Sequence, residues 1–167
     1  MLPTRASLLS LVLLAGIILM GGCKQSMVIS DVQYAQPIES VLEPDAEGVI
    51  RDPESGLSFS ILPLQYAETG DSTSVSTREV RLIRGQDGHY FVTASSYRHV
   101  YVLKPLDSRL KVERRILISK EGIARPAFNQ REPYVVLLNR QTGESYRLSS
   151  SGIVSSQPET TAEAGKP

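Results

Sequence analysis

The two histidines of the chain, His89 and His99, are the side chains whose type and spacing come nearest to a metal or proton-transfer site. Alternating apolar residues predict strands over 89–94 and 97–103, and a hairpin of these strands could place the two imidazoles about 5 Å apart. A metal site needs three or four ligands, however, and neither range contains a carboxylate. We therefore expect a polar surface pair, with no metal and no other cofactor.

Ser108 and Lys111 form a second candidate, because they have the Ser-x-x-Lys spacing. This spacing resembles a motif of penicillin-binding enzymes, in which the lysine lies one helical turn from a nucleophilic serine. Here the two residues straddle a predicted turn and the start of a predicted strand, so the helical geometry is lost, and the partner motifs are missing. The chain also has no phosphate-binding glycine loop and no nucleophile elbow. We expect a protein that is not an enzyme.

The first 23 residues have the order of an export signal. A short basic head is followed by the apolar run 8–20, and Gly21 and Gly22 then precede Cys23, the only cysteine. This ending resembles the lipobox of bacterial lipoproteins, where a branched apolar residue and two small residues precede a cysteine that is acylated and becomes the new N-terminus. Met20 departs from the family pattern, which usually has Leu at that position.

Two plainer interpretations of this segment stay open. The uncharged run 6–22 has 17 residues, the short limit for an uncleaved membrane-spanning helix, and an ordinary secretory signal could contain an incidental cysteine. The resemblance to lipoproteins implies two or three acyl chains on Cys23, and two or more chains give stable membrane attachment. Lys24 follows the cysteine in place of the Asp that retains many lipoproteins in an inner membrane. The resemblance therefore implies the periplasmic face of an outer membrane, or the outer cell surface in a host with a single membrane.

Composition and charge set further limits. If Cys23 is acylated, no thiol remains for a disulfide, and without tryptophan and with 6% aromatic residues the core must consist mainly of Val, Leu and Ile. The net charge is zero, but residues 31–72 contain nine acids and one base, whereas residues 73–148 contain seven acids and fourteen bases. The two regions could pair with each other or meet separate partners, but we expect an ordinary solvated surface with compensating charges. We expect no nucleic-acid partner.

The hydrophobic pattern predicts an all-β fold. Alternating segments begin at Leu57 and are separated by turn signals about every ten residues, such as the glycine-containing turn 85–88. This spacing is typical of a small antiparallel meander that closes into a sandwich or barrel. We predict a signal peptide over 1–22, an acidic tether over 23–56, a β-domain over 57–148 and a disordered tail over 149–167. Residues 134–139 are the most apolar segment and predict an inner strand.

The period of two in these strands predicts a binding face. If Val80, Leu82, Val100, Val102 and the apolar residues of 110–118 point inward, the residues that alternate with them point to solvent. The exposed set would then include Arg81, Tyr97, Tyr101 and Arg115, and Tyr and Arg are residues that interfaces favour. A register shift of one residue would bury the tyrosines instead. We expect an interaction module of an envelope complex for secretion, pilus formation or assembly; the alternative is a binding protein for a small or polymeric ligand, such as cell-wall glycan.

Overall fold

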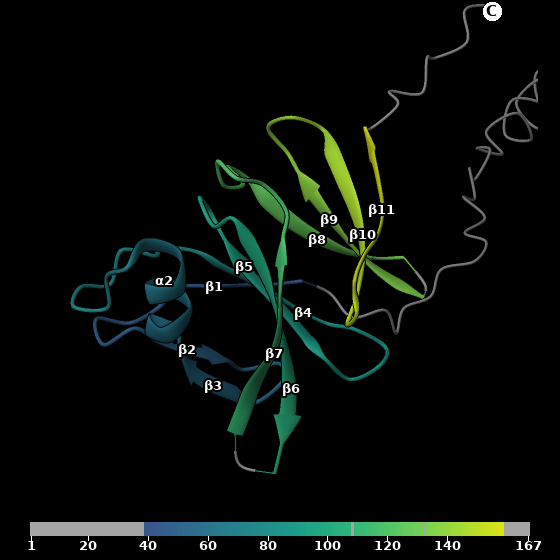
Figure 1. The fold of residues 1–167 in the computed structure, drawn as a ribbon. Helices are drawn as coiled ribbons and strands as arrows, with labels where there is room; N and C mark the ends of the chain where they lie inside the picture. The colour runs from purple at the N-terminus through teal and green to yellow at the C-terminus, as the bar shows by residue number, and fades with distance from the viewer. Residues whose placement is uncertain (1–38, 108, 132, 159–167) are drawn as a thin grey trace, which may run out of the picture. The chain divides into compact units, whose positions relative to one another are not determined.

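The computed structural model describes residues 39–107, 109–131 and 133–158. The predicted signal peptide, Cys23 and the first part of the predicted tether lie outside these residues. The described part consists of antiparallel sheets and one helix, so the predicted all-β class is confirmed (Figure 1).

A five-stranded antiparallel sheet has the strand order β1-β4-β5-β6-β7. Its strands are β1 (Ser40–Leu42), β4 (Val80–Arg84), β5 (Tyr90–Ala94), β6 (His99–Leu106) and β7 (Arg109–Leu117). The predicted turn 85–88 connects β4 to β5, and Gly88 has a φ of 84°, which glycine adopts without the penalty of a side chain. All five side chains of β5 are buried, so the middle of this sheet does not alternate between core and solvent.

A four-stranded antiparallel sheet follows in the sequence, with the order β11-β10-β9-β8. It contains β8 (Pro126–Arg131), β9 (Tyr134–Asn139), β10 (Glu144–Ser149) and β11 (Gly152–Pro158). The prediction of an inner strand over 134–139 is confirmed, because β9 lies between β8 and β10.

A third group combines the hairpin of β2 (Val49–Asp52) and β3 (Leu57–Ser60) with the helix α2 (Leu62–Thr69). The helix has Pro63 in its first turn and ends at Gly70, whose φ is 77°. Proline at the start and a left-handed glycine at the end are ordinary helix boundaries. The sequence analysis missed this helix, since it has only eight residues and no clear period.

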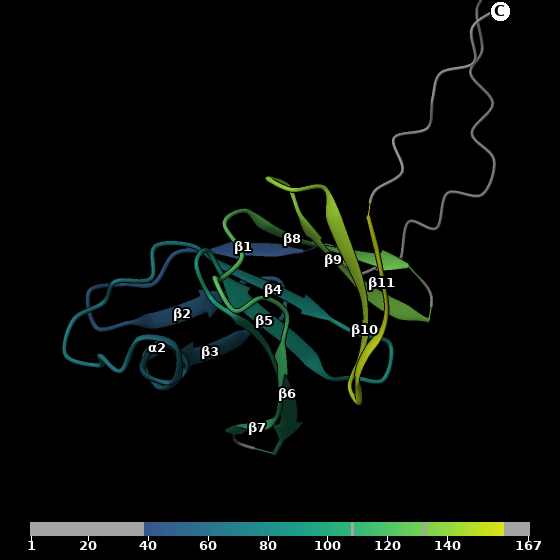
Figure 2. The same cartoon turned by 45° about the horizontal axis from the view of Figure 1, so that its top comes forward.

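Each face of the five-stranded sheet is covered by a different apolar core (Figures 1 and 2). On one face, Tyr101 and Leu82 pack with Ile50 of β2, with Leu64 of α2 and with Ile61, which directly precedes the helix. On the other face, the core joins the sheet to β8, β9 and β10 and contains Ile83, Phe91, Val100, Val102, Phe128, Val135, Leu137 and Leu148. Burial on both faces is the physical reason why a simple inside–outside alternation fails here.

A β-bulge in the β6–β7 hairpin overturns the predicted orientation of 110–118. The register shifts between Val102 and Leu103, so that Glu113 is an extra residue on β7. A bulge exchanges the faces of all residues beyond it. As a result Leu110 packs on the core next to α2 and Ile116 on the opposite core, while Val112 is 43% exposed.

The predicted domain boundaries also change. Strands β1 and β2 lie inside the segment predicted as tether, so the folded domain begins before residue 57. Strand β11 lies inside the segment predicted as a disordered tail, and its residues Gly152–Pro158 pair with Glu144–Ser149 of β10. Residues 159–167 lie outside the described part of the chain.

Candidate binding surfaces and a buried carboxylate

Four strands form the outer edges of the two larger sheets, and they differ in how they are protected. An edge strand has unpaired backbone groups that can pair with another chain, and charged side chains or a bulge normally prevent this. Strand β1 has only three residues. In β8, the backbone N–H of Phe128 donates a hydrogen bond of 2.7 Å to the Glu39 carboxylate. The two longer edges, β7 and β11, are therefore the candidates for binding.

Strand β11 is an edge without charge. No Asp, Glu, Lys or Arg occurs from Leu148 to Pro158, and Ile153 and Val154 are 44% and 48% exposed. Val154 is the extra residue of a bulge, because Leu148 pairs with Ile153 and Arg147 pairs with Ser155. This bulge protects only the start of the strand, and beyond it residues 155–158 pair with β10 without interruption. We call residues 152–158 the β11 edge.

Strand β7 is a basic edge, and its connection to β6 forms an exposed basic and apolar surface. The pairing of β6 with β5 ends at Leu103, so residues 104–106 pair only with β7. In Figures 1 and 2 this end of the hairpin extends past β4 and β5. We call it the hairpin tip and define it by six residues: Lys104, Leu106, Arg109, Leu110, Lys111 and Val112.

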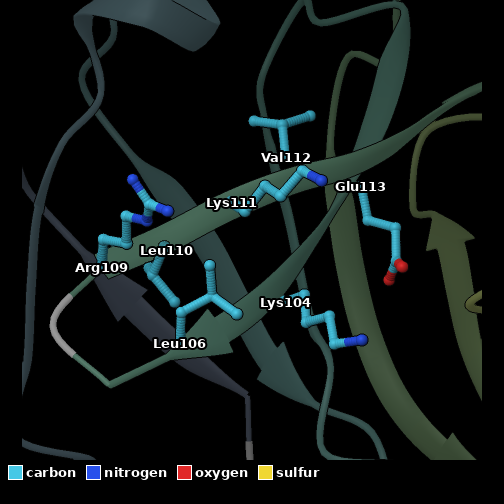
Figure 3. A pocket seen from close by; sticks show the side chains of 7 residues that line it. All are labelled: Lys104, Leu106, Arg109, Leu110, Lys111, Val112 and Glu113. Carbon is cyan, nitrogen blue, oxygen red and sulfur yellow. The ribbon is translucent and has the colours of Figure 1, made fainter.

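The hairpin tip borders a hollow of about 620 Å³, whose lining also includes Glu113. Figure 3 shows Leu106 and Leu110 close together between the two strands, with the charged ends of Lys104, Arg109 and Lys111 directed away from them. Leu106 is 39% exposed. Within the part of the chain that the structure describes, no ion pair joins these three bases to a carboxylate. The tip thus combines unpaired positive charge with exposed apolar side chains.

The expected exposure of Tyr97 and Tyr101 is wrong. Their exposed fractions are 3% and 1%, and both belong to the core beneath α2. The Tyr97 hydroxyl lies 2.8 Å from the Thr77 hydroxyl, and burial raises the pKa of Tyr97 to about 12. Burial is also the main cause that raises the pKa of Tyr101. The layer formed by α2 covers the face that the strand pattern alone assigns to solvent.

The two arginines predicted to be exposed, Arg81 and Arg115, differ in their burial. The Arg81 side chain is 14% exposed, and its Nη1 lies 3.0 Å from Glu39 Oε2. Because the other oxygen of Glu39 accepts the N–H of Phe128, this carboxylate links the two larger sheets. Burial alone would lower the pKa of Arg81, but the carboxylates of Glu39 and Glu79 raise it. Arg115 is exposed on β7 as expected, and its part in binding stays a prediction.

Glu68 is a buried carboxylate that accepts four hydrogen bonds, more than any other carboxylate of the described residues. Its side chain is 2% exposed at the end of α2. Oε1 accepts hydrogen bonds from the Tyr101 hydroxyl at 2.8 Å and from His99 Nδ1 at 2.9 Å. Oε2 accepts the backbone N–H of Arg98 at 2.9 Å and its Nε at 3.3 Å. Burial would raise the pKa of Glu68, but these hydrogen bonds outweigh it and hold the pKa below its ordinary value.

The Glu68 cluster fastens α2 to the start of β6. Arg98 also donates from Nη2 to the Glu68 carbonyl at 2.9 Å, which satisfies a free carbonyl at the helix end. All four hydrogen bonds to the Glu68 carboxylate thus join the helix to residues 98–101 at the start of β6. Sequence reasoning missed it because the partners are some thirty positions apart.

The expected pairing of the two histidines is wrong. Strand β5 pairs with β6 so that Tyr90 faces Leu103, which places His89 and His99 at opposite ends of the hairpin. His89 instead has carboxylate neighbours, with Nε2 at 2.6 Å from Glu113 and Nδ1 at 3.1 Å from Asp87. Both histidines thus acquire acidic partners from outside the two strands. Among residues 39–107, 109–131 and 133–158, no group of three or more potential ligands could hold a metal ion.

The remaining sequence candidates are only partly described. Ser108 lies outside the described residues, and Lys111 lies on β7, a strand, so the helical spacing of the Ser-x-x-Lys motif does not occur. Cys23 also lies outside. No helix in the described ranges is long and apolar enough to cross a membrane.

Comparisons with known proteins place the chain in no family. No protein-family model matches it, no curated protein matches it, and no solved structure matches it.

Proposed function

We propose that the chain is a lipid-anchored, non-catalytic protein of the cell envelope that binds an extended segment of a protein partner along the β11 edge. Acyl chains on Cys23 attach it to the membrane, on the periplasmic face of the outer membrane. The partner is a component of an envelope complex for secretion, pilus formation or assembly. The observation that supports this most strongly is the long, uncharged and exposed edge of β11.

The backbone of β11 supports the binding mode. Among the described residues, β11 pairs with β10 alone, which leaves the backbone N–H and C=O groups of its other side available for a partner. An extended segment can add to such an edge, with backbone hydrogen bonds giving affinity and alternate side chains giving specificity. Ile153 and Val154 supply exposed apolar contacts beside this edge.

The contrast with β7 supports the choice of edge. Strand β7 has the same kind of open side, but it contains Arg109, Lys111, Arg114 and Arg115, and charges of this kind discourage strand pairing. Arg114 Nε lies 3.2 Å from the Ser150 carbonyl, in the turn before β11. Because the β11 edge has no charged side chain, the segment that pairs with it is expected to be apolar and extended. The alternative, a ligand site on an aromatic sheet face, loses its support because Tyr97 and Tyr101 are buried.

Site-specific photocrosslinking in intact cells tests the proposal. A photoreactive residue at Ile153 is expected to give one discrete product with a different envelope protein. The same residue at Tyr66, which is 58% exposed on α2, is the matched control and should give none. Ile153→Lys should abolish the interaction when the photoreactive residue is moved to Val154, whereas Gln141→Lys, in an exposed turn, should not.

Three results would overturn this assignment. A product of twice the mass of the chain would show that a second copy occupies the edge. Equal labelling from Ile153 and Tyr66 would indicate non-specific collision. The absence of any product from Ile153 and Val154 would show that β11 is a free edge.

A further inference from the structure

We propose that the hairpin tip docks on a bilayer surface that contains anionic phospholipid, the same membrane to which Cys23 is anchored. This proposal adds a second contact and an orientation to the lipid-anchored protein, and it depends on the proposed function for the anchor alone. It concerns β6 and β7 and is independent of the β11 edge.

The apolar side chains of the tip have the arrangement of an interfacial contact. Leu106 and Val112 are 39% and 43% exposed, although they lie in paired strands, and Val112 directly precedes the bulge at Glu113. Leu110 is half-buried and packs at the margin of the core. Exposed apolar residues surrounded by bases can enter the headgroup region while the charges remain among the phosphates.

The charges of the tip favour an anionic surface. Lys104, Arg109 and Lys111 are exposed and have no carboxylate partner within the described ranges. Asp107, in the turn, opposes them in part. The Glu113 carboxylate already has a partner, because its Oε2 lies 2.6 Å from His89 Nε2. Each base near an anionic leaflet increases membrane partitioning by roughly fivefold, so the three together contribute on the order of a hundredfold before the opposition of Asp107.

The length of the tether makes this contact accessible. Sixteen residue steps separate Cys23 from Glu39, the first described residue, and a chain of this length spans at most about 55 Å. An acylated Cys23 would therefore keep the domain near the bilayer, where even a weak contact is populated because the local concentration is high.

A polarity-sensitive fluorophore tests the contact on the full chain. The label is attached at Leu106→Cys, with the matched control Tyr66→Cys on α2. The labelled proteins are reconstituted into vesicles of phosphatidylcholine alone or with about one third phosphatidylglycerol. Co-flotation reports the anchor, and the label reports the tip, so failure of one is distinguishable from failure of the other.

The label at position 106 is expected to shift to the blue in phosphatidylglycerol vesicles and to lose most of this shift in high salt. The label at position 66 should not shift. Replacing Lys104, Arg109 and Lys111 by Gln should remove the shift while co-flotation persists, whereas Arg140→Gln with Arg147→Gln, in the β9–β10 hairpin, should leave it unchanged.

Four outcomes would overturn the proposal. The first is an anchored protein whose label at position 106 remains aqueous. The second is an equal shift with and without phosphatidylglycerol. The third is a shift with an acidic peptide but not with vesicles, which would assign the tip to a protein. If the chain does not co-float, titration with phosphatidylglycerol vesicles still measures the tip, and the absence of a shift at any lipid concentration overturns the proposal.

Discussion

Replacing Glu68 by Gln tests the central tie between α2 and the five-stranded sheet. The carboxylate accepts four hydrogen bonds, from the Arg98 backbone N–H, Arg98 Nε, His99 and Tyr101. An amide of the same shape retains only one acceptor oxygen and has no charge. Hydrogen bonds to a charged group are worth about 1.5–3 kcal/mol each and roughly twice as much as neutral ones. If each of the four bonds loses about half of its value with the charge, the free energy of unfolding is expected to fall by about 3–6 kcal/mol.

The pH dependence of this difference gives a second readout. The pKa of Glu68 is lowered below its ordinary value of 4.5, so its stabilising contribution is present above the pKa of the unfolded chain and disappears as the pH falls through the folded pKa. Protonated Glu resembles Gln in shape and charge. The difference between wild type and Glu68→Gln should therefore be largest at neutral pH and shrink at pH values below about 4.5.

Urea denaturation at several pH values measures both effects. Glu121→Gln is the matched control, because Glu121 is exposed and its carboxylate has no ion-pair partner within the described residues. It should change the free energy of unfolding by less than about 0.5 kcal/mol. The reasoning would be refuted if Glu68→Gln behaved like this control at neutral pH, or if its effect were the same at low pH.

Two further predictions concern the same region of the fold. Gly122→Ala should lower the free energy of unfolding in urea by about 2–4 kcal/mol, because the new Cβ would lie 2.5 Å from the Ser96 carbonyl oxygen and the residue has a φ of 90°. The control Gly56→Ala, with a φ of 68° and no atom within 4 Å of the new Cβ, should lower it by only about 1 kcal/mol. Equal losses for the two variants would contradict the clash with Ser96. Tyr101→Phe should cost about 1–2 kcal/mol by removing the hydroxyl that donates to Glu68 at 2.8 Å, and an unchanged midpoint would show that the hydroxyl contributes nothing.

Local sequence signals were sufficient to predict the β4–β5 hairpin and the inner strand β9. The β4–β5 hairpin was predicted because its apolar alternation is interrupted by a glycine-containing turn over 85–88, and the structure has this turn. The inner strand β9 was predicted because its apolar run exceeds that of its neighbours. Strand β11 was missed because its Ser-rich, uncharged sequence is also typical of a disordered tail, and only pairing with β10 selects the strand.

The orientation of side chains could not be predicted from the strand period alone. Tyr101 is buried because α2 covers its face of the sheet, and nothing within β6 indicates that a helix does so. The bulge at Glu113 reverses the faces of Leu110 and Val112 relative to Ile116. A period of two predicts which residues share a face only within an uninterrupted strand, and burial on both faces removes the contrast between core and solvent.

The polar clusters were missed for a related reason. Glu68 and His99 are separated by 31 positions, and their contact depends on how α2 packs on the sheet. Glu113 and His89 meet between strands that are not neighbours in the sequence. A single sequence gives the residue types, but it does not say which distant segments are placed together.

Mass spectrometry of the mature protein from its host membrane tests the proposed lipid anchor. An acylated anchor predicts an N-terminal peptide that begins at Cys23 and has the added mass of two or three acyl chains. Cys23→Ser should remove this mass and leave either unprocessed precursor or an unacylated form. A mature protein with an unmodified Cys23, whether the preceding residues are cleaved or retained, would show that the protein is not lipid-anchored.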